Sequence, residues 1–194
     1  MLKKYLPHIA LGLFAAQLLL MLVSWLLSAA FPASGYHSLL SSEGLRWFLG
    51  HFVDSLSTPL LVWLVLLSLA YGVLRHSGLL HYGKSFREHR ALLMTLLLLV
   101  VIVAVIVLLS AVPHAVLLSA TGRLFPSPFS QSLVPVVAFS VTLLSAFYGM
   151  VSGNLETLPR VYDALLDGIR RAAPLLLFYI LLMQIYESLC YVFQ

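Results

Sequence analysis

Long apolar stretches alternate with short polar ones along the whole chain. A helix needs about 20 mostly apolar residues to cross the roughly 30 Å hydrocarbon core of a bilayer. Five stretches approach or exceed that length, and they cover about residues 8–31, 59–74, 91–112, 133–151 and 172–193. The pattern therefore predicts an all-α integral membrane protein with about five transmembrane helices, folded as a single membrane domain over residues 1–194.

Residues 42–57 form an amphipathic segment before the second span. Their apolar positions follow the 3.6-residue period of one helix face, and they are Leu45, Phe48, Leu49, Phe52, Val53 and Leu56. Ser42 is the predicted cap of this helix, whereas Thr58 and Pro59 mark the start of the second span. We expect the amphipathic helix to lie flat on the outer interface of the membrane.

A second amphipathic segment covers residues 157–171. Its apolar stripe is formed by Val161, Leu165 and Ile169, and its polar face carries Arg160, Asp163, Asp167, Arg170 and Arg171. One interpretation is an interfacial helix that anchors the fifth span. The other is a coupling helix that contacts a partner protein.

The first apolar stretch shares features with a secretory signal peptide. Lys3 and Lys4 precede it, and small residues at 28–30 lie near its end. Its apolar run is longer than the 7–15 residues that are typical of a signal sequence. We therefore expect it to be retained as the first membrane helix.

Basic residues fall mostly on one side of the predicted spans. With the N-terminus inside, nine are cytoplasmic, namely Lys3, Lys4, Arg75, Lys84, Arg87, Arg90, Arg160, Arg170 and Arg171. The outer segments hold only Arg46 and Arg123. Because Lys and Arg concentrate in cytoplasmic loops, the count predicts an N-in, C-out topology. The expected location is a bacterial inner membrane.

The composition agrees with a membrane location. Apolar residues make up 61% of the chain and charged residues 9%, whereas soluble domains carry about 25% charged residues. The net charge of +4 is explained by the cytoplasmic loops, so it gives no indication of nucleic-acid binding. A single cysteine, Cys190, excludes a disulfide framework.

Polar side chains inside a span indicate candidate functional sites, because burying them in lipid is costly. The fifth span holds Gln184 and Glu187, which lie on roughly one helix face at i and i+3. One interpretation is a proton or cation site. The other, which the position of Glu187 in the outer third of the span favours, is an interfacial carboxylate that is hydrated or paired with Arg46 or Arg123.

Gly149 and Gly153 form a small-xxx-small pair at the cytoplasmic end of the fourth span. This spacing lets two helix backbones approach closely, so it predicts a helix-packing contact within the chain or between subunits. Pro113 and Pro135 are expected to bend or end helices locally.

The residue pattern indicates neither a metal site nor a catalytic centre. His76, His81 and His89 lie in the basic cytoplasmic loop, but they lack the close, paired spacing of zinc ligands. The sequence contains no nucleotide-binding loop, nucleophile elbow or zinc-protease helix. We expect a protein that is not an enzyme and binds no cofactor; an enzyme using Glu187 with a histidine is the weakest alternative.

Several blocks of the sequence resemble the p-aminobenzoyl-glutamate transporter (AbgT) family. These are Leu-Leu-Ser-Ser-Glu-Gly-Leu-Arg at 39–46, His-Ser-Gly-Leu-Leu at 76–80, Thr-Gly-Arg-Leu-Phe-Pro-Ser-Pro-Phe at 121–129, Val134-Pro135, and Tyr148-Gly149 with Gly153 and the amphipathic segment that follows. The blocks occur in the order of the family and cover most of the chain.

The resemblance implies a shortened relative of these transporters. Family members are well over twice as long, and they transport through two re-entrant hairpins and broken helices around a substrate and sodium site. Here one plain Leu/Val helix stands where a hairpin region is expected, and no stretch resembles a re-entrant pair of half-helices. The blocks present resemble the scaffold and dimer-forming helices, so no substrate or ion residue is carried over.

Two functions agree with these observations. The first is a non-catalytic scaffold or accessory subunit of a membrane assembly, present in the lipid bilayer as a homodimer or as part of a larger complex. The alternative is a small secondary transporter or exporter of aromatic or acidic solutes, similar to aminobenzoyl-glutamate, with its site formed between subunits.

Overall fold

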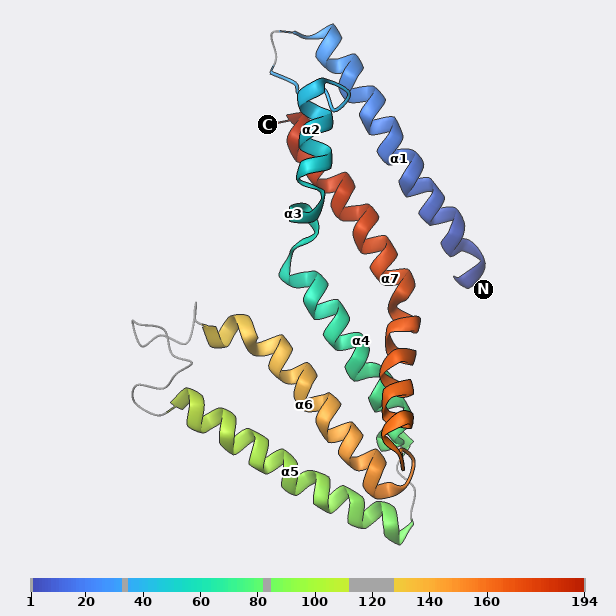
Figure 1. Ribbon diagram of the computed structural model, residues 1–194, viewed down its shortest axis with the longest axis vertical. Coiled ribbons are helices and arrows are strands. Elements are labelled where there is room, and N and C mark those ends of the chain that lie inside the picture. Colours follow the sequence, from blue (N-terminus) through green and yellow to red (C-terminus); the bar gives the residue numbers. More distant parts are fainter. Residues whose placement is uncertain (1, 33–34, 82–84, 112–127, 194) are drawn as a thin grey trace. The chain divides into compact units, whose positions relative to one another are not determined.

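The computed structural model describes residues 2–32, 35–81, 85–111 and 128–193, and all regular structure within these ranges is helical (Figure 1). Within these described ranges, five helices are long and apolar enough to cross a membrane. They are α1 (Leu2–Ala30), α4 (Pro59–Ser77), α5 (Phe86–Ala111), α6 (Pro128–Ser152) and α7 (Leu158–Phe193). The prediction of an all-helical chain with five such helices is confirmed.

The predicted helix over residues 42–57 is divided into two. Helix α2 covers Ser42–Gly50 and α3 covers Phe52–Leu56. The break follows Gly50, where glycine disfavours a continuous helix, and the His51 amide donates to the Trp47 carbonyl, 2.8 Å away.

The cap of α2 is Ser41, so the prediction that Ser42 caps this helix was wrong. The Ser41 hydroxyl accepts a 3.0 Å hydrogen bond from the Gly44 amide. This bond is the one that an N-cap side chain makes with the third residue of a helix. Ser42 is consequently the first helical residue, and Pro59 begins α4 as predicted.

Helix α7 is continuous across the boundary predicted between residues 171 and 172. It has 36 residues, which at 1.5 Å per residue corresponds to about 54 Å, more than the roughly 30 Å of a hydrocarbon core. The sequence changes there from amphipathic to apolar, but arginine and alanine at 170–173 are strong helix formers. A change of polarity therefore does not end the helix, which also continues through Pro174.

Several helices extend past the predicted apolar spans. Helix α5 begins at Phe86 rather than at 91, and α1 begins at Leu2 rather than at 8. Charged residues can continue a helix beyond the hydrocarbon, so hydropathy alone underestimates its length. Helix α6 continues through Pro135, where a bend or an end was predicted, and Pro113 lies outside the described residues.

The chain contains two compact units. Residues 1–61 and 173–194 form the first unit, and residues 62–172 form the second. In the first unit, α2 lies beside the C-terminal end of α7 (Figure 1), where the Trp47 and Tyr191 rings stack with centroids 4.3 Å apart.

In the second unit, α5 and α6 run side by side in opposite directions (Figure 1). Val73 of α4, Ala164 of α7 and Leu155 between α6 and α7 are its buried apolar core.

The predicted orientation can be tested by labelling. In a Cys190→Ser background, which removes the exposed native thiol, we expect an impermeant maleimide to modify Ser127→Cys but not Ser85→Cys in intact cells. The basic segment containing residue 85 should be cytoplasmic, because positive charge is retained on that side. Both variants should react after permeabilisation. Modification of Ser85→Cys in intact cells would contradict the five-span topology.

Candidate functional site

Buried polar side chains connect α1 to the C-terminal half of α7. The Gln17 amide nitrogen donates to the Ser188 hydroxyl across 2.8 Å, and Gln184 lies one turn before Ser188 on α7. All three side chains are at least nine-tenths buried. We call Gln17, Gln184 and Ser188 the intramembrane polar cluster.

Two acceptors of the intramembrane polar cluster have no hydrogen-bond partner. The Oε1 atoms of Gln17 and Gln184 are both buried and unpaired. An unpaired buried carbonyl loses its hydration without compensation, which costs about 1–3 kcal/mol. The cluster can therefore accept hydrogen bonds from a donor that enters it.

A second set of polar contacts in the first unit joins the start of α4 to α7. The Tyr179 hydroxyl donates to the Leu56 carbonyl across 3.1 Å and lies 2.6 Å from the Thr58 hydroxyl. Tyr179 is 5% exposed, so these bonds satisfy a buried phenol. These contacts hold the segment between α3 and α4 against α7.

The structure places Glu187 on α7 within the first unit, and its side chain is partly exposed. The ion pairs among the described residues do not include Glu187, so the expected pairing with Arg46 is absent there. Arg123 lies outside the described residues. Of the two polar residues predicted in this span, Gln184 is thus the buried one and Glu187 the accessible one.

Two glycines bring the backbones of α4 and α7 together in the second unit. A Cβ atom added to Gly72 would lie 2.7 Å from the Gly168 Cα and would also overlap the Ala164 carbonyl. One added to Gly168 would overlap the Ser68 carbonyl. Small residues at this spacing permit such close crossings, so the two helices depend on the absence of side chains here.

A carboxylate lies near the polar end of the α4–α7 crossing. Asp167 Oδ2 accepts from Arg171 Nε across 2.6 Å and lies 3.7 Å from His76 Nε2. His76 also donates from Nδ1 to the Gly72 carbonyl, 2.9 Å away. Because Nδ1 holds a proton in that bond, His76 Nε2 attracts the carboxylate only in the doubly protonated imidazolium, and in that state Asp167 links α7 to the last turn of α4.

Of the predicted helix-packing residues, Gly149 lies in the last turn of α6 and Gly153 directly follows the helix. A Cβ on Gly149 would lie 2.6 Å from the Leu155 side chain, and one on Gly153 would lie 2.7 Å from the Arg87 guanidinium carbon. Gly153 has a φ of +92°, a left-handed conformation that favours glycine at a helix end. Within the chain, Gly149 thus leaves room for the Leu155 side chain. Gly153 leaves room for Arg87 and permits the turn after α6.

The close helix contact at Gly72 and Gly168 was missed by the sequence reasoning. The signal was present, because Ser68 with Gly72 and Ala164 with Gly168 are both small-xxx-small pairs. Ser188 and Gln17 carried a weaker signal. Each lies in an apolar span that holds other polar residues as well, and nothing in the sequence indicates that the two meet.

In the described part of the chain, the length and apolar composition of five helices are those of a multi-pass α-helical membrane protein. Among the residues described, no three His, Cys, Asp or Glu side chains gather closely enough to hold a metal ion. Comparison with protein-family models, curated proteins and solved structures finds no match. The resemblance to the p-aminobenzoyl-glutamate transporter family accordingly stays a prediction from the sequence.

Proposed function

We propose that the protein is a non-catalytic scaffold or accessory subunit of an assembly in a bacterial inner membrane. The observation that supports this role is the use of buried polar side chains as links between helices. Gln17 bonds to Ser188, and Tyr179 bonds to the segment that begins α4. Interhelical hydrogen bonds of this kind stabilise membrane helix bundles, by about 0.6 kcal/mol each on average.

The apolar surface of the helices also supports an assembly role. Leu97 and Leu108 of α5 and Phe139 of α6 are each more than 60% exposed in the single chain. Such faces contact lipid or another membrane helix, and van der Waals packing between helices drives association within a bilayer. We propose that part of this surface contacts a second copy of the chain or another subunit.

The two unpaired amide oxygens favour a second candidate function, a small secondary transporter of aromatic or acidic solutes with a site formed between subunits. Gln17 and Gln184 place buried acceptors inside the first unit. A solute N–H or O–H group, or a cation, would satisfy an acceptor of this kind. In this case the intramembrane polar cluster would be part of the transport site.

The assembly state tests the first proposal. Native mass spectrometry of the protein released from its membrane should detect a complex heavier than a single 21.5 kDa chain, because a scaffold functions only when it holds another chain. The control is the same extract after chemical denaturation, which should give the mass of one chain. A single-chain species across the accessible concentration range would contradict the scaffold proposal.

A further inference from the structure

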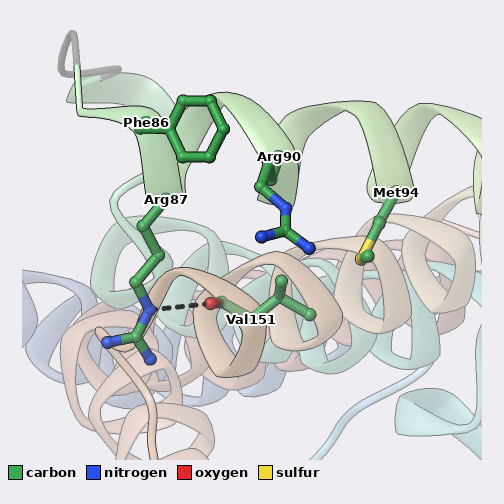
Figure 2. Close-up of a pocket in the computed structure, with 5 residues that line it drawn as sticks. All are labelled: Phe86, Arg87, Arg90, Met94 and Val151. Carbon is green, nitrogen blue, oxygen red and sulfur yellow. Dashed lines mark hydrogen bonds between the residues drawn. The ribbon is translucent and has the colours of Figure 1, made fainter.

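A cavity of about 250 Å³ lies between the first turns of α5 and the end of α6 in the second unit. Its walls are Phe86, Arg87, Arg90, Met94 and Val151. Figure 2 shows Arg87, Arg90 and Met94 extending from α5 toward α6, whereas the Phe86 ring lies alongside α5. Two positive charges and an apolar wall therefore share one open cavity.

The two arginines differ in how they are held. Arg87 Nε donates to the Val151 carbonyl across 3.1 Å (Figure 2), which satisfies a carbonyl at the end of α6 and fixes this side chain. Arg90 lies with its guanidinium carbon 5.9 Å from the centre of the Phe86 ring, a cation–π distance. The guanidinium groups are thus positioned before any ligand arrives.

Neither guanidinium is neutralised by a carboxylate in the described part of the chain. The ion pairs found there involve Asp167 and Glu156. Glu88 lies between the two arginines in sequence, but it does not line the cavity. The cavity consequently carries positive charge that an anion would balance, and guanidinium groups bind phosphate oxygens through paired hydrogen bonds.

The apolar part of the cavity indicates the source of the anion. Met94 lies two turns along α5 from Arg87, beyond the charged residues at 87–90 and in the apolar run that follows them. The cavity therefore extends from the charged start of the helix into its apolar region. A free phosphate would leave the Met94 side of the cavity unfilled, whereas a lipid provides a phosphate and an acyl chain together.

We propose that this cavity binds one anionic phospholipid, with its phosphate between Arg87 and Arg90 and the beginning of an acyl chain against Met94 and Val151. Basic pockets between membrane helices are suited to such headgroups. The site is independent of the intramembrane polar cluster, so it does not depend on whether the protein is a scaffold or a transporter.

The test is a lipid titration of the purified full-length protein in a neutral detergent. Thermal unfolding is followed while phosphatidylglycerol, phosphatidylcholine with the same acyl chains, or inorganic phosphate is added. A ligand that binds only the folded state raises the unfolding temperature in a concentration-dependent way. We expect a saturable rise with phosphatidylglycerol alone. An equal rise with phosphatidylcholine, or with phosphate, would overturn the proposal.

Substitutions test whether phosphatidylglycerol binds at this cavity. Arg90→Gln should raise the half-saturating phosphatidylglycerol concentration about fivefold, the effect expected for one basic residue near a membrane surface. Arg90→Lys keeps the positive charge, so its half-saturating phosphatidylglycerol concentration should rise less. Arg170→Gln removes an exposed cation from α7, far from the cavity in sequence, and should titrate like the parent. The proposal fails if Arg90→Gln titrates like the parent or if Arg170→Gln weakens binding equally.

Discussion

Replacing Gly168 with leucine should lower the thermal unfolding temperature of the purified protein by roughly 5–10 °C. The new side chain would overlap the Ser68 carbonyl and lie close to the Gly72 Cα of α4. Backbone atoms cannot rotate away as a flexible side chain can, so α4 and α7 must separate. Overpacking costs about 1–3 kcal/mol or more, which corresponds to a shift of that size for a chain of this length.

The matched control is Gly12→Leu. Gly12 also lies inside a long apolar helix, but a Cβ there would meet no atom within 4 Å. Both variants add the same side chain and remove the same helix-weakening glycine. Gly12→Leu should therefore unfold at the temperature of the parent or slightly above it. Equal behaviour of Gly12→Leu and Gly168→Leu in the thermal scan would show that the α4–α7 contact is absent.

The number and character of the helices could be predicted from sequence because they depend on local composition. An apolar stretch must satisfy its backbone hydrogen bonds internally within lipid, and a helix does so without any partner. The five predicted spans therefore correspond to α1, α4, α5, α6 and α7. Their ends were less predictable, since charged residues such as those that begin α5 continue a helix outside the apolar region.

The contacts between helices could not be predicted in the same way. The bond between Gln17 and Ser188 joins residues 171 positions apart, and either residue alone is an ordinary polar substitution in an apolar span. The small-residue signal was ambiguous for another reason. Gly149 with Gly153 matches the same pattern as Gly72 with Ser68, but the left-handed conformation of Gly153 belongs to a turn.

Substitutions in and beside the intramembrane polar cluster distinguish a structural role of these side chains, which the unfolding temperature reports, from a role in transport. Gln17→Leu removes the donor to the buried Ser188 hydroxyl at a cost of about 1–3 kcal/mol. It also removes the unpaired Gln17 Oε1, which offsets this cost, so the unfolding temperature should stay near that of the parent. Gln184→Leu should not lower it, because the Oε1 of this residue has no partner to lose. Glu187→Gln, which keeps the shape of a partly exposed side chain, should behave like the parent.

The most direct test of the scaffold proposal is solute uptake by the same four proteins in liposomes. Uptake of p-aminobenzoyl-glutamate is measured with an inward sodium or proton gradient, and liposomes without protein give the background. We predict that the parent, Gln17→Leu, Gln184→Leu and Glu187→Gln all stay at background. Gradient-driven uptake by the parent that Gln184→Leu or Glu187→Gln abolishes, while unfolding at the parent's temperature, would contradict the scaffold proposal and establish a transporter.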